Sequence, residues 1–154
     1  MLERADPHVE FEDLYLASEQ TLRRALVAAY GREIGNEATD EAFAWAWEHR
    51  ERLAQIEKPI GYLFRVGQTS ARRLRARPLN GRPPEWQLPP EVEPGLVDAL
   101  RSLSESQRVA VVLHHGYALT YREIADYFDI QPSTVQNHVE RGMKKLKRRI
   151  RGPQ

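Results

Sequence analysis

The chain has 154 residues and a formal net charge of +1, which is enough length for one domain of typical size or for two small ones. It contains no cysteine, no apolar run approaching the roughly 18 residues of a membrane span, no phosphate-binding glycine loop and no nucleophile motif. These absences argue against a disulfide scaffold, a membrane protein, an enzyme and a cofactor or metal site, and they lead us to expect a soluble cytoplasmic protein.

The first 60 residues are acidic, with 13 acids, 7 bases and a net charge of −6, and their apolar spacing predicts two helices. The first helix is expected over residues 9–30. The glycines at both ends of 31–35 predict a loop, after which Asn36 can cap the second helix. Trp45 and Trp47 cannot both face the same core, so we expect one of them at a surface that meets a partner or DNA.

A third helix with the opposite charge is predicted over residues 60–77. Residues 61–90 carry six arginines and one glutamate, a net charge of +5. The apolar side of this helix is expected to carry Tyr62, Leu63 and Val66. Its basic, hydrogen-bonding side carries Arg65, Gln68, Thr69, Arg72 and Arg73. This composition suits a helix that lies along nucleic acid, with a merely solvated helix as the alternative.

Residues 78–95 predict a break in the fold. They contain six of the ten prolines and two glycines, so they can form neither a helix nor an inner strand. We interpret them as a semi-extended linker and expect an all-α protein of two small helical domains, over residues 8–77 and 96–151.

The second domain is expected to open with a short helix near residues 95–103. Ser104 and Gln107 then form a capping box for a helix that Gly116 ends. A second capping box, of Thr120 and Glu123, starts the next helix.

A turn and a long helix follow in the same domain. Asp129 falls where the turn needs a left-handed residue, and Pro132 can occupy the first position of the next helix. The spacing therefore predicts a helix-turn-helix within residues 120–151.

The helix that begins at Pro132 has two chemically different sides. An apolar stripe is expected to comprise Val135, Val139, Met143, Leu146 and Ile150. The early outward side carries short polar groups and a cation, namely Ser133, Thr134, Gln136, Asn137, His138 and Arg141. Seven bases and no acid follow from residue 141 onward, Lys144 and Lys145 among them. A recognition helix in the DNA major groove needs such groups, although a hairpin in an ordinary helical bundle is the alternative.

The pattern L-S-x-x-Q-R, Y-x-E-I-A, T-V and R-G across residues 100–147 resembles domain 4 of bacterial sigma factors. The acidic helix, the proline-broken turn and the arginine-rich helix upstream resemble sigma domain 2. The linker lies where the extracytoplasmic-function (ECF) group joins its two domains, and the length agrees with that group. The resemblance implies a cytoplasmic sigma factor with promoter DNA, RNA polymerase core and an anti-sigma or other regulatory protein as candidate partners.

The resemblance also assigns roles to particular residues. Glu37, Asp40 and Glu41 fall on the acidic motif that meets the clamp helices of RNA polymerase in the family. Arg65, Gln68, Thr69, Arg72 and Arg73 are expected near the downstream promoter element. Gln136, Asn137 and Arg141 are expected to read the upstream one.

Two other functions remain open at this point. The chain could be a sigma-like regulator that binds DNA through its second domain but does not open promoters. It could also be an interaction protein whose first domain only binds a regulatory partner. Transcription from a promoter fragment with core polymerase distinguishes the sigma factor from both.

Overall fold

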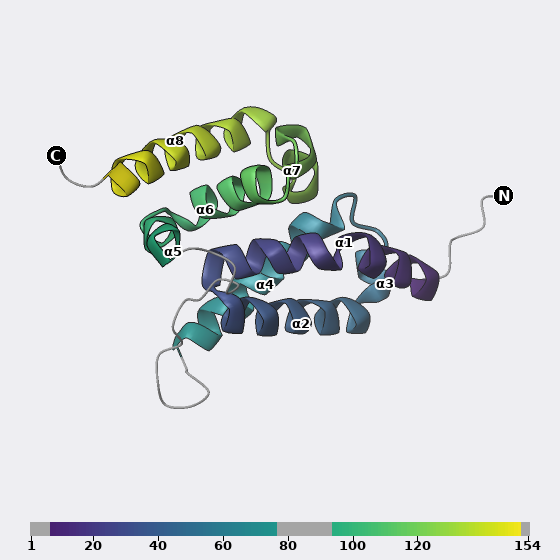
Figure 1. Cartoon of the computed structure of the whole chain (residues 1–154). Helices are drawn as coiled ribbons and strands as arrows, with labels where there is room; N and C mark the ends of the chain where they lie inside the picture. The colour runs from purple at the N-terminus through teal and green to yellow at the C-terminus, as the bar shows by residue number, and fades with distance from the viewer. Residues whose placement is uncertain (1–6, 77–93, 152–154) are drawn as a thin grey trace.

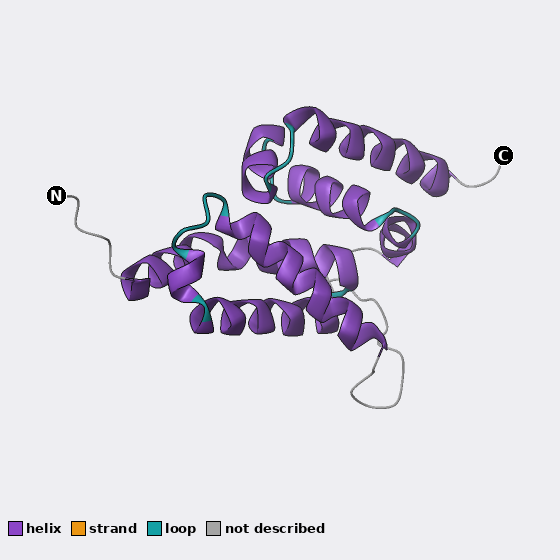
Figure 2. Cartoon of the chain, turned by 180° about the vertical axis from the view of Figure 1, so that it is seen from behind, coloured by secondary structure: helices purple, strands orange, loops and turns teal. Residues whose placement is uncertain are grey.

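A computed structural model describes residues 7–76 and 94–151, and all regular structure in these two ranges is helical, as the sequence predicts (Figures 1 and 2). The helices form two groups that lie one above the other in Figure 1, an N-terminal unit (α1–α4) and a C-terminal unit (α5–α8). Nearly all of the predicted linker lies outside the described residues. Each described helix is too short or too polar to span a lipid bilayer.

The N-terminal unit consists of α1 (Pro7–Tyr30), α2 (Arg32–Glu48), the single turn α3 (Arg50–Leu53) and α4 (Pro59–Ala76). The predicted loop at 31–35 is wrong. The helix α2 already begins at Arg32, and only Gly31, with φ of 90°, separates it from α1. Gly35 lies inside α2 against α1, where an added Cβ would come within 2.5 Å of the Val27 backbone. The glycine therefore serves close helix packing, and Asn36 is not a cap.

The C-terminal unit consists of α5 (Pro94–Arg101), α6 (Glu105–Val111), the π-helical turn η1 (Val112–Gly116), α7 (Tyr121–Phe128) and α8 (Pro132–Arg151). Both predicted capping boxes are present, at Ser104 and at Thr120. Asp129 ends α7 in the left-handed conformation, with φ of 56°, and α8 begins at Pro132. The predicted helix-turn-helix is therefore confirmed, and its geometry follows from these local signals.

One side of α8 packs into the C-terminal unit through Val135, Val139 and Leu146, all buried. Gly142 lets α8 approach α6, because an added Cβ there would lie 2.7 Å from a methyl group of Val111. Ile150 was expected on the apolar stripe but is 63% exposed, since the last turn of α8 extends past the helices it packs on.

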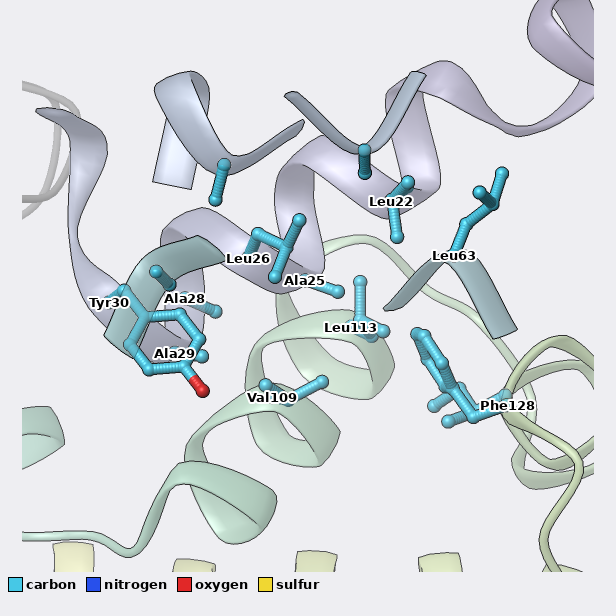
Figure 3. Close-up of a cluster of buried hydrophobic side chains, with 14 of the residues drawn as sticks. Leu22, Ala25, Leu26, Ala28, Ala29, Tyr30, Leu63, Val109, Leu113 and Phe128 are labelled. Carbon is cyan, nitrogen blue, oxygen red and sulfur yellow. The ribbon is translucent and has the colours of Figure 1, made fainter. Parts of the chain in front are cut away.

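A continuous apolar core joins the two units (Figure 3). Leu22 and Leu26 of α1 lie on one side of this core, and Val109 and Leu113 of the C-terminal unit lie on the other. Phe128, at the end of α7, closes the cluster beside α4, where its ring lies 4.8 Å from that of Phe64 in an edge-on arrangement. The C-terminal unit thus packs on α1 through α6 and η1 and on α4 through α7.

Candidate nucleic-acid interface

The outward side of α8 carries most of the side chains that the sequence assigned to DNA. Val135 and Val139 fix the rotation of the helix by facing the core. The opposite side is consequently exposed to solvent and displays Ser133, Gln136, Asn137, Arg141, Lys144 and Lys145. Short polar groups therefore occupy the first turns and cations the later ones, an order suited to base edges first and phosphates afterwards.

Two other residues of α8, Thr134 and His138, turn toward the N-terminal unit. They line a groove of about 220 Å³ together with residues of α4, α6 and α7. Partial burial, together with the charge of nearby Arg141, lowers the pKa of His138 below its usual value near 6.5. The imidazole is therefore neutral at neutral pH and offers one donor and one acceptor.

Residues of α4 line another part of the same groove. Arg65 and Gln68, both assigned to DNA from the sequence, line it together with Gly61 and Phe64. The fold thus brings groups from two separate predicted DNA-reading surfaces to the same groove. No feature of the sequence indicated this juxtaposition, because the facing residues are far apart along the chain.

The remaining candidates on α4 lie outside that groove. Thr69 is exposed and donates its hydroxyl to the carbonyl of Arg65, 3.1 Å away. Arg72 is exposed as well. Its positive charge lowers the pKa of Tyr30 of α1, against the larger effect of burial, which raises that pKa. Arg73 forms an ion pair with Glu41 of α2. The structure therefore divides the predicted downstream reading surface between two sides of α4.

The acidic cluster on α2 is on the surface, as predicted, and two of its three members are paired within the chain. Glu37 is exposed. Asp40 accepts a hydrogen bond from Arg23 of α1 at 2.7 Å, and Glu41 accepts one from Arg73. These pairs lie in solvent and hold the carboxylates in place, but exposed pairs contribute only about 0–1 kcal/mol to stability.

An aromatic cluster lies beside these acids. The sequence predicted that either Trp45 or Trp47 lies at a surface, and Trp47 is the exposed one, but the cluster around it was not recognised. Phe11 and Tyr15 of α1 meet Trp47 and Phe43 of α2 at ring separations of 5.2 and 4.9 Å. Trp47 is 41% exposed, and Tyr15 is 39% exposed. Asp40, Phe43 and Trp47 share one side of α2 because they are three and seven positions apart. An exposed apolar patch bordered by charge is typical of protein-binding surfaces.

A polar pair on α8 was also missed. The amide nitrogen of Gln136 donates to the carboxylate of Glu140, 2.8 Å away. Glu140 is the one acid in α8, among seven bases. The spacing of four residues could have revealed the pair, because such residues are neighbours on a helix surface.

A helix-turn-helix with an exposed polar side and a basic end is typical of proteins that bind DNA through the major groove. Comparison with known proteins identifies the family of this part of the chain. Residues 95–146 match the family described as "Sigma-70, region 4". The C-terminal unit is therefore a sigma-70 region 4 domain, as its resemblance to sigma domain 4 predicted.

A solved structure shows that the similarity in fold extends over both units. The sigma factor RpoE from Bartonella quintana, crystallised in complex with the anti-sigma factor NepR, is similar with a TM-score of 0.62 and 17% sequence identity. The alignment covers 94% of this chain and 99% of the Bartonella chain. Among curated protein sequences there is no match. The predicted resemblance to sigma factors is confirmed by the region 4 match and by this shared fold.

Proposed function

We propose that this protein is an ECF-type sigma factor that binds RNA polymerase core in the cytoplasm and directs it to a two-part promoter. The main support is the free side of α8, which displays Gln136, Asn137 and Arg141 on a sigma-70 region 4 domain. In this role α8 reads the upstream element and α4 lies near the downstream one. Residues 8–77 and 96–151 act as the two domains, joined by residues 78–95.

The surface of α1 and α2 supports polymerase as the partner of the N-terminal unit. It combines an acidic cluster, of Glu37, Asp40 and Glu41, with the aromatic cluster around Trp47. Aromatic anchors surrounded by charge supply both affinity and orientation in protein complexes. The similar Bartonella protein was crystallised with an anti-sigma factor, and we include an anti-sigma protein among the proposed partners.

The function is tested by run-off transcription with purified core polymerase and a set of promoter fragments. A sigma factor yields transcripts of defined length that depend on this protein. A regulator that binds DNA without opening promoters binds the same fragments but yields no transcript. An interaction protein binds neither DNA nor core polymerase.

Neutralising the basic end of α8 is expected to weaken binding to all DNA sequences to the same degree. Lys144, Lys145, Lys147 and Arg148 are exposed cations, and contacts to phosphate position a protein without reading sequence. A glutamine at each of the four positions should also flatten the dependence of log K on log salt, by about 0.9 per lost phosphate contact. Titrations at several salt concentrations measure both effects. A loss of sequence preference at an unchanged salt slope contradicts this role.

Removing Gln136 or Asn137 is expected to cost about 1–3 kcal/mol on the correct upstream element and little on random DNA. Because Glu140 holds the amide nitrogen of Gln136, the amide oxygen is free to accept from an amino group of adenine or cytosine. Glu140→Ala should therefore relax selectivity at the same base pair as Gln136→Ala. Binding measured on every single-base variant of the element tests this. Equal losses on all sequences mean that the pair does not read bases.

A further inference from the structure

One ion pair joins the surface proposed to bind polymerase to a surface proposed to bind DNA. Nη2 of Arg73, on α4, donates to Oε2 of Glu41, on α2, at 2.5 Å. Glu41 belongs to the acidic cluster of α2, and Arg73 belongs to the DNA-binding candidates of α4. The two residues are 32 positions apart, and the packing of α4 on α2 brings them together. A partner that binds either surface therefore meets a charge that is already paired.

The core fixes the backbone on both sides of this pair. Ala42, next to Glu41, and Ala71, two residues before Arg73, are both fully buried. The charged side chains themselves extend into solvent, with side-chain exposures of 63% for Arg73 and 30% for Glu41. Breaking the pair therefore needs only the rotation of two surface side chains, and the fold does not have to change.

Arg73 lies beside other groups that can contact a phosphate. Thr69 is one helical turn earlier on the same side of α4, Arg72 is the adjacent residue, and both are exposed. Within residues 7–76 and 94–151, the two arginines have no ion pair other than that of Arg73 with Glu41. Glu41 therefore engages one of the two cations that this part of α4 offers to DNA.

The other paired acid of the cluster is held differently. Asp40 pairs with Arg23 of α1 at 2.7 Å, and Arg23 also donates to Glu19 and Asn36. Arg23 therefore stays bound by the other acceptors when Asp40 engages a partner. Of the two paired acids, Glu41 is the one whose cation is a candidate for DNA.

We propose that the pair of Arg73 and Glu41 couples the binding of polymerase to the binding of downstream promoter DNA. The proposal rests on the proposed function. A polymerase cation that pairs with Glu41 releases Arg73, and the guanidinium then contacts a DNA phosphate. Contact of Arg73 with phosphate releases Glu41 for polymerase in the same way. The pair is broken once for two binding events, so each partner strengthens the binding of the other by the same factor.

The size of this coupling follows from the exposure of the pair. An exposed ion pair contributes up to about 1 kcal/mol, which corresponds to a factor of about five in a binding constant. We therefore expect a coupling of roughly two- to fivefold. It should shrink as the salt concentration rises, because salt screens exposed charges.

The first test measures DNA binding without polymerase. Its probe is duplex DNA of random sequence, because a phosphate contact does not depend on sequence. All proteins in this test carry the four glutamines at the basic end of α8, so that the contacts of α4 contribute a larger share of the affinity. Glu41→Gln should tighten binding by roughly two- to fivefold. It should also steepen the dependence of log K on log salt by up to about 0.9, the value for one added phosphate contact.

Two controls assign this effect to Arg73. Glu48→Gln makes the same change of charge at an exposed position about two turns further along α2, and it should have a much smaller effect. In a protein that already carries Arg73→Gln, the change Glu41→Gln should do no more than Glu48→Gln does.

The second test measures binding to purified core polymerase without DNA. Arg73→Gln releases the carboxylate of Glu41 and should tighten this binding by roughly two- to fivefold. Arg52→Gln removes a positive charge from an exposed position of α3 and should leave the affinity unchanged. A pair that only stabilises the fold gives no such gain, because its loss does not strengthen binding to either partner.

Separate results overturn the proposal and the function on which it rests. Equal effects of Glu41→Gln and Glu48→Gln on DNA binding mean that only net charge matters, and they overturn the coupling. An Arg73→Gln variant that binds polymerase no more tightly than wild type overturns it as well. Both results leave the sigma function standing when the wild-type protein binds polymerase. A wild-type protein that binds no polymerase overturns the proposed function and the coupling with it.

Discussion

Replacing the buried Arg108 with alanine is expected to lower the free energy of unfolding by about 3 kcal/mol or more, because its guanidinium joins the two units. The side chain donates to four backbone carbonyls, those of Ala28, Ala29, Leu100 and Leu103. A hydrogen bond from a charged donor contributes roughly 1.5–3 kcal/mol, and acceptors left unpaired in the core add a further cost. Urea denaturation of the full chain measures the change.

Matched substitutions separate the loss of these bonds from a general effect of losing an arginine. Arg122→Ala removes an exposed arginine of α7 and should change stability by no more than about 0.5 kcal/mol. Arg108→Lys keeps a positive charge but not the planar fork of donors, so it should fall between alanine and wild type. An alanine variant as stable as wild type contradicts the role of Arg108 in the interface.

The helix-turn-helix could be predicted from the sequence because its signals are local. The capping boxes at Ser104 and Thr120 each involve a partner three residues away, and Asp129 and Pro132 act on their own backbone conformation. Such signals depend little on the rest of the fold. The start of α7, its left-handed end and the start of α8 accordingly lie where the sequence places them.

The contact between the two units could not be predicted, because its partners are distant along the chain. In the sequence Arg108 is the last residue of the L-S-x-x-Q-R pattern. The two carbonyls on α1 to which it donates lie about eighty residues earlier. Gly35 shows the same limit on a smaller scale. A glycine predicts a loop from local preference, whereas close packing of α2 on α1 is what requires it here.

Part of the candidate site could be predicted from the sequence, and part could not. The exposed polar side of α8 follows from the helical period, since Val135 and Val139 set its rotation. The candidates on α4 do not form one surface, because Arg65 and Gln68 line the groove while Arg73 pairs with Glu41. Helical spacing alone does not show which side of α4 another unit covers.

The acidic cluster of α2 is suited to a test of polymerase binding because its charge can be reversed without harming the fold. Asp40 and Glu41 pair with Arg23 and Arg73, and the side-chain exposures of the two acids are 64% and 30%. Exposed ion pairs contribute about 0–1 kcal/mol each. The double variant should therefore remain folded, with a helical spectrum and a urea midpoint close to those of wild type.

Reversing Asp40 and Glu41 to lysine together is expected to abolish co-purification with core RNA polymerase. Charge pairing across an interface sets register and speeds encounter, and like charges brought together cost several kcal/mol, which is a loss of a thousandfold or so in affinity. The control is Glu51→Lys with Glu57→Lys, the same charge change at exposed positions of the same unit outside α2. Binding of the double variant to upstream-element DNA should be unchanged, because α8 lies in the other unit. A double variant that retains wild-type affinity for polymerase contradicts the assignment of α2 as the polymerase-binding helix. A wild-type protein that never binds polymerase contradicts the sigma function and leaves a DNA-binding regulator.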